Sequence, residues 1–396
     1  IPPSPRLLVP PSPRPPIPFS PPTLATYPGI LLEPEYAWAK NMGGSGDEGG
    51  YSITVDSSGN IYTTGYFQGT VDFDPGSSTS YLTSVGSYDT FISKLNPDGS
   101  FAWAKQLGGS GSGGYGKSIA IDSSGNIYTT GKFSGTADFD PGTGTANLNS
   151  AGGNDTFISK LNADGTFAWA KRLGGSNQEN GYSIAIDNSD NVYTTGYFYG
   201  TVDFDPGSGT FNLTCSSGLY SDMFISKLNP DGTFAWAKSM GGSGVDEGNS
   251  IAIDSSGSVY TTGYFSGTGD FDPGSGTFNL TSAGSADIFI SKLDSSGTFA
   301  WAKSMGGISS GGGESIAIDS SGNVYTTGYF QGTTDFDPGT GTANLTPAGQ
   351  TDIFISKLTP RVTPTVTIDQ AGSQTDPATT SPINFTVTFS EAVTGF

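Results

Sequence analysis

The chain has 396 residues, including 60 Gly and 25 Pro, and its 36 acidic and 16 basic residues give a formal net charge of −20. It has no His, which excludes Ser-His-Asp and Cys-His catalytic groups and His-bound zinc. The acidic balance argues against nucleic acid and anionic membrane surfaces as partners, because both attract Lys and Arg. No segment approaches the roughly 18 apolar residues of a membrane span, so we expect no membrane insertion within this sequence.

The N-terminal segment, residues 1–35, is rich in proline, with 13 of the 25 prolines in its first 34 residues. Proline fixes φ and has no backbone donor, so the segment is predicted to be an extended, solvated linker. A ligand for a proline-binding module is the alternative. The sequence does not begin with Met and stops within a pattern at Phe396, so we expect a piece of a longer protein.

A repeat dominates the next part of the chain. Ala-Trp-Ala-Lys recurs with spacings of 65, 66, 67 and 65 residues. A fixed period of this length indicates a solenoid or a propeller. The five tryptophans of this word are Trp38, Trp103, Trp169, Trp236 and Trp301.

One repeat contains four strand-like runs, which we name A to D. They are Ser250–Asp254, Ser258–Phe265, Asp287–Leu293 and Thr298–Lys303. All four are rich in β-branched or aromatic residues or alternate with period two, which predicts strands. Short Gly-containing turns join A to B and C to D. No helical period appears, so we expect an all-β fold.

The count of these runs suggests how the array ends. A D run, Tyr36–Lys40, precedes the first A run, and the last C run, Asp352–Leu358, has no D run after it. We therefore expect a five-bladed β-propeller of four-stranded blades over residues 36–358, in which the first D run completes the last blade. An open stack of sheets, which would leave Asp352–Leu358 unpaired, is the alternative.

Three words recur in order: Asn-Val-Tyr-Thr-Thr-Gly-Tyr-Phe, Asp-Phe-Asp-Pro-Gly and Asp-Ile-Phe-Ile-Ser-Lys-Leu. They resemble the bacterial SBBP-type β-propeller repeats of large secreted proteins. The resemblance implies a propeller in an extracellular setting and no defined biochemical activity. The family name suggests seven blades, whereas this chain has five units.

The C-terminal segment, residues 359–396, departs from the repeat. Val366–Asp369 and Ile383–Phe389 alternate as half-buried strands around a turn at Asp376-Pro377, and Ser390–Phe396 breaks off. This resembles the opening strands of bacterial Ig-like modules. We expect a linker and an incomplete Ig-like β-sandwich.

The D run predicts how blades pack. Phe101 and Trp103 share one face of this strand, and Ala102 and Ala104 share the other. We expect the aromatic face to be buried and the alanine face to let a neighbouring blade approach closely.

Paired carboxylates are the first candidate for chemistry. The Asp-Phe-Asp-Pro-Gly word presents two Asp at i and i+2, an arrangement that suits Ca²⁺. Turn formation is the competing explanation, since Asp-Pro-Gly is typical of a type II turn. The pairs are Asp72/Asp74, Asp138/Asp140, Asp203/Asp205, Asp270/Asp272 and Asp335/Asp337.

A second set of carboxylates ends the A runs. On an innermost strand these five could ring one mouth of a central channel, where repulsion favours a cation or raised pKa values. The local explanation is that each Asp bonds the backbone of its own turn. The residues are Asp56, Asp122, Asp187, Asp254 and Asp319.

Catalysis is not expected. A glycosidase needs two carboxylates in different environments, and every unit here carries nearly the same acids. Cys215 stands where other units have Ser84, Ser150 or Ser282, with no basic residue near it in sequence, so we interpret it as an incidental substitution. We assign no catalytic, cofactor-binding or metal residues; Ca²⁺ is the only cofactor considered.

The units differ most in their D–A connections and in B–C connections such as Cys215–Ser221. In a propeller both emerge on the same face, and loops on a rigid scaffold often bind partners. We expect a non-catalytic extracellular or cell-surface module for binding, adhesion or spacing, with a protein or glycan ligand on this face. Loop drift and a carbohydrate-active enzyme using Asp carboxylates are the alternatives. The D–A connections are 41–51, 106–117, 172–182, 239–249 and 304–314.

Overall fold

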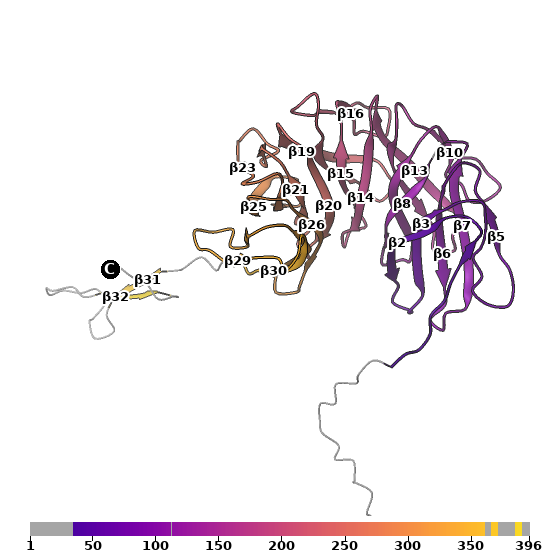
Figure 1. The fold of residues 1–396 in the computed structure, drawn as a ribbon, viewed down its shortest axis with the longest axis horizontal. Coiled ribbons are helices and arrows are strands. Elements are labelled where there is room, and N and C mark those ends of the chain that lie inside the picture. Colours follow the sequence, from indigo (N-terminus) through magenta and orange to yellow (C-terminus); the bar gives the residue numbers. More distant parts are fainter. Residues whose placement is uncertain (1–34, 112, 361–365, 371–384, 390–396) are drawn as a thin grey trace, which may run out of the picture. The chain divides into compact units, whose positions relative to one another are not determined.

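The computed structural model describes residues 35–111, 113–360, 366–370 and 385–389 (Figure 1). The chain divides between residues 39 and 40, and all strands of the described ranges lie after this boundary. All regular secondary structure in the described ranges is β, which confirms the all-β class. No helix long and apolar enough to cross a membrane occurs among these residues. The predicted Pro-rich linker lies outside the described residues, apart from residue 35.

Units 1 to 4 each contain four long strands in the predicted order A, B, C, D, and unit 5 contains A, B and C among the described residues. The A strands are β2 (Glu48–Val55), β8 (Tyr115–Ile121), β14 (Glu179–Ile186), β20 (Asp246–Ile253) and β26 (Gly311–Ile318). The B strands are β3 (Ile61–Phe67), β9 (Ile127–Phe133), β15 (Val192–Phe198), β21 (Val259–Phe265) and β27 (Val324–Phe330). The C strands are β6 (Asp89–Leu95), β12 (Asp155–Leu161), β18 (Asp222–Leu228), β24 (Asp287–Leu293) and β30 (Asp352–Leu358). The D strands are β7 (Phe101–Gly109), β13 (Phe167–Gly175), β19 (Phe234–Gly242) and β25 (Phe299–Gly307).

Neighbouring strands within a unit pair antiparallel, as in β14-β15-β18-β19. The A–B turn is tight because Gly59 and its equivalents adopt positive φ, which glycine does without steric cost. Unit 3 departs from this rule, since Asp190 takes the position with a φ of 61°. Asp tolerates the left-handed region better than most residues.

The D strands are longer than predicted and take part in two sheets. In β19, residues up to Met240 pair with β18, and then Gly241 and Gly242 pair with β22 (Thr268–Asp270) of the next unit. The predicted D–A connections therefore belong largely to strands, which corrects the loop ranges given above. The glycines allow this close approach, because a Cβ on Gly242 would clash with Thr268 O.

The B–C connections hold a short hairpin that the repeat pattern did not predict. Each hairpin begins just before the Asp-Phe-Asp-Pro-Gly word and extends the sheet of the preceding D strand, giving six-stranded sheets such as β20-β21-β24-β25-β28-β29. The hairpins are β4 (Thr70–Asp72) with β5 (Tyr81–Thr83), β10 (Thr136–Asp138) with β11 (Asn147–Asn149), β16 (Thr201–Asp203) with β17 (Asn212–Thr214), β22 with β23 (Asn279–Thr281), and β28 (Thr334–Asp335) with β29 (Asn344–Leu345). The first hairpin pairs with β1 (Gly43–Gly44).

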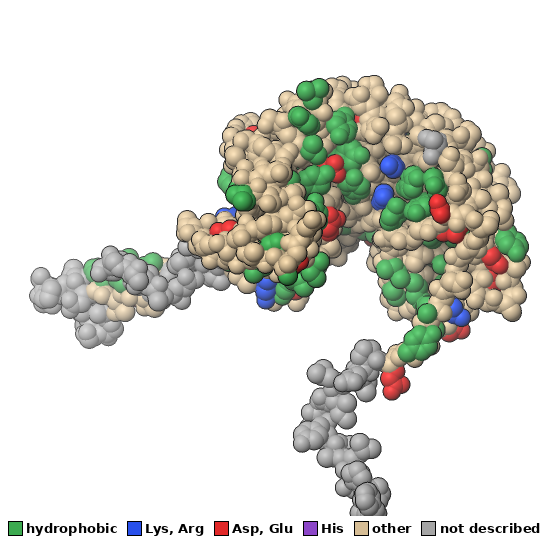
Figure 2. Space-filling model, in the orientation of Figure 1, with side chains coloured by type: hydrophobic (Ala, Val, Ile, Leu, Met, Phe, Trp, Pro, Cys, Tyr) green, Lys and Arg blue, Asp and Glu red, His purple; other side chains and the backbone are tan. Residues whose placement is uncertain are grey.

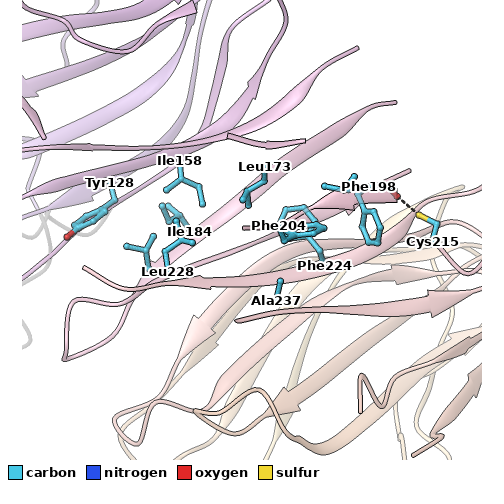
Figure 3. Packing of buried hydrophobic residues seen from close by; sticks show 12 residues of the cluster. Tyr128, Ile158, Leu173, Ile184, Phe198, Phe204, Cys215, Phe224, Leu228 and Ala237 are labelled. Carbon is cyan, nitrogen blue, oxygen red and sulfur yellow. Dashed lines mark hydrogen bonds between the residues drawn. The ribbon is translucent and has the colours of Figure 1, made fainter. Parts of the chain in front are cut away.

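The core lies between consecutive units. Figure 3 shows one such cluster, in which Ile184 from the A strand of unit 3 packs with Tyr128 and Ile158 of unit 2. The same cluster continues to Phe204, the aromatic residue of the Asp-Phe-Asp-Pro-Gly word, which is 1% exposed. Phe101 and Trp103 pack against core clusters but are only half-buried, so the predicted burial of the aromatic face of the D strand is partial.

The predicted completion of the last blade is not observed. Residues 36–40 form no strand, and β30 pairs with β27 and with no other described strand. Unit 5 therefore has three strands, A, B and C, among the described residues.

The C-terminal segment forms the two predicted strands. β31 (Val366–Gln370) and β32 (Phe385–Phe389) pair antiparallel, with Val366 opposite Phe389. The predicted turn at Asp376-Pro377 and the segment Ser390–Phe396 lie outside the described residues.

Candidate functional site

Each unit has two ends with different chemistry. The A–B and C–D turns form the hairpin end, and the D–A and B–C connections form the loop end. Backbone bonds join the two connection types at the loop end: Gly114 N donates to Tyr88 O at 2.8 Å, and Asp246 N donates to Ser221 O at 2.9 Å. The prediction that both connections emerge on one face is confirmed.

At the hairpin end, the Asp that ends each A strand organises its own turn. Asp56 Oδ1 accepts the backbone N–H groups of Ser58 and Asn60, and Oδ2 accepts the Asn60 amide and the Tyr62 hydroxyl at 3.1 Å. The local turn explanation is confirmed in all five units, with Ser258 replacing the Asn in unit 4. Burial raises the pKa of Asp56, but these hydrogen bonds outweigh it and leave the pKa below its usual value. Hydrogen bonds in their own turns likewise lower the pKa values of Asp187, Asp254 and Asp319, which is the opposite of the shift expected for a repelling ring of carboxylates.

The tyrosine that bonds this Asp also contacts Lys and Trp. In unit 4, Lys292 Nζ lies 4.7 Å from the Tyr260 ring centroid and 3.7 Å from Asp254 Oδ2, and the Trp301 ring is 6.2 Å from Tyr260. Burial, with opposing contributions from Lys292, raises the pKa of Tyr260. This phenol stays protonated at neutral pH and therefore donates a hydrogen bond.

A pocket of about 870 Å³ opens beside this group in units 4 and 5. Trp301, Tyr260, Lys292 and Lys357 line it. In earlier units the C–D turn of the next unit covers the equivalent Trp, as Gly165 does for Trp103. The pocket therefore marks the place where the last unit lacks a C–D turn.

At the loop end, four tyrosines from units 1 and 2 converge, and we name them the tyrosine cluster: Tyr51, Tyr66, Tyr88 and Tyr115. Tyr66 lies at the centre, with ring centroids 5.5, 5.4 and 5.1 Å from Tyr51, Tyr88 and Tyr115. They come from β2, β3, a B–C connection and β8. All remain at least partly exposed, so the cluster presents both ring faces and hydroxyl groups to solvent.

Two lysines adjoin the tyrosine cluster. Lys117 Nζ lies 3.8 Å from the Tyr51 ring centroid, and Lys132 Nζ lies 5.2 Å from that of Tyr115. Burial lowers the pKa of Lys117, and burial together with the Lys117 charge lowers that of Lys132. Cation–π contact keeps both ammonium groups at this aromatic surface.

A second aromatic group occupies the loop end of unit 3. Tyr197 lies 5.5 Å from Tyr182 and 5.8 Å from Tyr199 between ring centroids. Tyr199 borders a pocket of about 510 Å³ that Asn177 and Gln178 also line. D–A and B–C connections thus share a concave surface with amide and phenol groups.

The repeat pattern did not point to these tyrosines, although Tyr51, Tyr88, Tyr115 and Tyr182 lie in the connections predicted to bind a partner. One position in the sequence could have pointed to them, namely the residue before the Ser-Ile pair that recurs in all five A strands. This position changes in an otherwise uniform repeat: Tyr51, Lys117, Tyr182, Asn249 and Glu314.

The paired Asp of the Asp-Phe-Asp-Pro-Gly word bind backbone groups. Asp72 Oδ1 accepts the N–H groups of Asp74 at 3.0 Å and Ser80 at 2.8 Å, and Asp74 Oδ1 accepts that of Gly76 at 2.7 Å. Equivalent bonds occur in the other four units. Turn formation is confirmed, but the type II assignment is wrong, because Gly76 and its equivalents lack positive φ. The turn is built by the Asp side chain instead.

A further set of acids is buried at the start of the C strands. Asp222 is 1% exposed, and its Oδ2 accepts the Ser216 N–H and hydroxyl at 2.8 and 2.9 Å. Asp246 from the next unit is also buried, and its Oδ2 accepts the Gly242 N–H at 2.8 Å. Burial, reinforced by the Asp222 charge, raises the pKa of Asp246 to about 7. Burial likewise raises the pKa of Glu179 to about 7, beside Asp155.

Cys215 is buried, and its thiol donates to Phe198 O at 2.9 Å (Figure 3). Burial raises the pKa of this thiol to about 12, so it stays protonated and unreactive near neutral pH. This agrees with an incidental substitution. Over the described ranges, no three Asp, Glu or Cys side chains gather in a way that could hold a metal ion.

Comparison with known proteins identifies the repeat. Residues 38–66, 102–135, 168–197 and 235–271 match the SBBP family, described as a β-propeller repeat. These four segments are similar to the SBBP repeat, which supports the resemblance found in the recurring words. The repeated antiparallel sheets are consistent with a β-propeller.

Two individual proteins are similar to the chain. An uncharacterised WD repeat-containing protein of Acanthamoeba polyphaga mimivirus is 26% identical over 414 residues, covering 86% of this chain and 30% of the relative. The chain thus spans less than a third of that relative. A crystal structure of a protein of unknown function from Bacteroides caccae is 10% identical, covers 65% of this chain and 82% of that one, and has a TM-score of 0.26.

Proposed function

We propose that the repeat series is a non-catalytic binding module of a larger extracellular or cell-surface protein, serving adhesion or spacing, with a glycan or protein ligand at its loop end. The observation that carries the proposal is the tyrosine cluster. Four rings from four separate elements converge there while remaining accessible. Rigid aromatic side chains give contact area at low entropic cost, and their hydroxyl groups give polar contacts.

The charge distribution supports a ligand held by such contacts. Acidic and basic side chains are scattered over the face in Figure 2, which consists mostly of uncharged side chains and backbone. Lys117 and Lys132 bring positive charge to the tyrosine cluster of a chain with a net charge of −20. A neutral or acidic glycan, or a protein segment with exposed backbone and carboxylates, fits this chemistry.

A five-bladed propeller followed by the opening of an Ig-like domain is part of the same proposal. Five A, five B and five C strands support five as the blade number. The antiparallel pair β31–β32 supports the opening of an Ig-like domain. Spacing beside such domains is compatible with ligand binding at the loop end.

A carbohydrate-active enzyme is the weaker alternative. Asp246 and Glu179 have pKa values of about 7 beside a second carboxyl group, the pattern expected of a general acid. Both are buried, at 0% and 1% exposure, and no described pocket has them in its lining, so a substrate has no access to them.

The test is binding of the whole chain to a panel of polysaccharides and bacterial surface glycans by affinity electrophoresis, with reducing-end detection in parallel. We expect retardation that Tyr88→Ala and Tyr115→Ala abolish and that Tyr81→Ala, an exposed tyrosine outside the cluster, preserves. Release of reducing ends would support the enzyme instead. If no glycan and no surface protein is retained, the module acts as a spacer.

A further inference from the structure

We infer that the tyrosine cluster binds an acidic glycan, with Lys117 and Lys132 holding its anionic groups. The inference rests on the proposed binding function and names the class of ligand. Both lysines lie in unit 2, on the neighbouring strands β8 and β9, and both are half-buried. Their place in the repeat, their geometry and their charge each favour an anionic ligand.

The two lysines are exceptions within the repeat. The other ten lysines of the chain belong to the Ala-Trp-Ala-Lys and Ile-Ser-Lys-Leu words. Lys132 stands where the B strands of the other units have Tyr66, Tyr197, Tyr264 and Tyr329. Lys117 stands where the other A strands have Tyr51, Tyr182, Asn249 and Glu314. Unit 2 therefore carries two positive charges that folding of the repeat does not require.

The strand pairing brings these two charges to one tyrosine ring. Lys132 lies opposite Tyr115 in the pairing of β8 with β9, and Lys117 lies at the bulge between Gly116 and Ser118. A bulged residue is left out of the ladder, which redirects its side chain. Lys117 Nζ lies 5.8 Å and Lys132 Nζ lies 5.2 Å from the Tyr115 ring centroid. Both ammonium groups are therefore held at the same part of the tyrosine cluster.

Neither ammonium group has a carboxylate partner among the residues that the structure describes. The ion pairs in these ranges are made by Arg172, Lys227 and Lys292. Burial lowers the pKa of Lys132, and the charge of Lys117 lowers it further, so the two like charges act on one another. An anionic ligand would offset this repulsion, because an opposite charge favours the charged form of both groups. A neutral ligand would not.

The aromatic part of the site favours a sugar over an acidic peptide. Sugar rings present C–H groups that pack on the electron-rich faces of tyrosine rings, and their hydroxyl groups bond to phenol oxygens. Burial raises the pKa of Tyr66, and the charges of Asp47 and Glu48 add to this shift. A peptide with a charge on every residue would meet these acids as well as the lysines, whereas a glycan places neutral hydroxyl groups between its charges.

Affinity electrophoresis with charged and neutral forms of one polymer tests the inference. The whole chain is run through gels that contain polygalacturonate or the same polymer with its carboxylates methyl-esterified. We expect retardation about tenfold stronger in the charged polymer, as expected for charge-assisted contacts, and weaker in high salt. Dextran sulfate and dextran give the same comparison for sulfate groups, and the stronger of the two charged polymers identifies the anionic group.

The repeat itself supplies the matched variants. Lys117→Tyr with Lys132→Tyr places at both positions the residues that units 1 and 3 have there. We expect this variant to lose about tenfold in retardation by the charged polymer and to keep that by the ester. Lys117→Arg with Lys132→Arg should bind as the unmodified chain does. Lys94→Gln with Lys160→Gln removes the same charge at the hairpin end and should also bind normally, with circular dichroism confirming that each variant is folded.

The opposing results separate the ligand class from the binding function. Equal retardation by the charged and neutral polymers that Tyr115→Ala abolishes would overturn the acidic ligand and leave the binding function in place. Polyglutamate that retards the chain as strongly as the charged glycans would show that an acidic peptide is bound instead, which also overturns the inference. If no acidic polymer retards the chain, the inference is wrong, and the wider glycan panel then decides the binding function separately.

Discussion

At the scale of single residues, the phenylalanine of the Asp-Phe-Asp-Pro-Gly word explains why that word recurs. Phe204 lies 5.4 Å from Phe198 and 5.1 Å from Phe224 between ring centroids. Its flanking Asp residues hold the backbone turn that places it in the core. The phenylalanine of this word therefore packs in the core, and the two Asp carboxylates stabilise the turn.

We expect Phe204→Ala to lower the free energy of unfolding by about 3–5 kcal/mol, because it empties a fully buried site. Trp169→Ala should cost about half of this, since Trp169 is half-buried and its Nε1 donates at 3.2 Å to Pro230 O near the surface. Denaturant titration of both variants measures the two values. A larger loss for Trp169→Ala would contradict the assignment of the core.

The turn carboxylates also give a prediction about calcium. Each Oδ1 of Asp72 and Asp74 already accepts backbone N–H groups, which a cation would have to displace. We expect the same melting temperature in millimolar Ca²⁺ and in excess chelator. A rise of several degrees with Ca²⁺, removed by Asp72→Asn, would restore the metal hypothesis.

The buried acids predict a pH dependence. The folded pKa values of Glu179 and Asp246 are about 7, above the unfolded values near 4, so the folded chain binds extra protons in the interval between. Their contribution to stability is therefore fully present at low pH and is lost as the pH rises through about 7. We expect the melting temperature to fall between about pH 4 and pH 7 and to level off above that range.

Asp246→Asn provides the matched variant for this dependence. It removes one of the two titrating groups, so the fall in melting temperature should become shallower. Asp190→Asn, in the A–B turn of unit 3, leaves both groups in place and should leave the fall unchanged. Equal slopes in all three proteins would show that Asp246 does not carry the effect.

At the scale of elements, the D strand is the part that joins one unit to the next. Gly108 and Gly109 pair with β10 of the following unit, and a Cβ on Gly109 would clash with Thr136 O. We expect Gly109→Ala to lower the free energy of unfolding by about 1–3 kcal/mol through this crowding. Gly218→Ala, at a glycine with open space, should lie within about 0.5 kcal/mol of the unmodified chain. Equal losses of unfolding free energy in the two variants would show that the D-strand glycines are not needed for this close approach.

The elements also show what the sequence could predict. The A, B and C strands were predictable because five copies repeat the same period-two pattern between tight turns. The hairpin β10–β11 was not, because strands of three residues are too short to show a period. The length of the D strands was underestimated because Gly-Gly normally weakens a strand. Here the two glycines continue the strand, since they allow close pairing with the hairpin strand of the next unit.

The candidate site was predictable only as a region. The connections at the loop end were predicted to share a face, and they do. The tyrosine cluster was not predicted, because Tyr51, Tyr66, Tyr88 and Tyr115 come from two units and are up to 64 residues apart in sequence. Their convergence depends on the packing of one unit on the next, which local patterns do not contain.

At the scale of the whole molecule, the units form a series in which each contacts only its neighbours. Stability in such a series is the sum of the units and their interfaces, so the ends should be weakest. We expect the amides of β30 and β2, which have a neighbour on one side only, to exchange hydrogen faster than those of β15 in unit 3. Hydrogen exchange followed by mass spectrometry measures this order. Uniform protection from β2 to β30 would show that the ends are covered in solution.

The long D strands have a mechanical consequence. In β19, the residues from Phe234 to Met240 pair with the C strand of the same unit, and the last two residues pair with the hairpin of the next unit. Such a strand cannot be pulled free without breaking the hydrogen bonds to both partners. Under tension applied to its two termini, the protein should therefore extend in coupled steps that start at an end, rather than by independent rupture of single sheets. A chain stretched between two anchors would resist until its outermost sheet gives way.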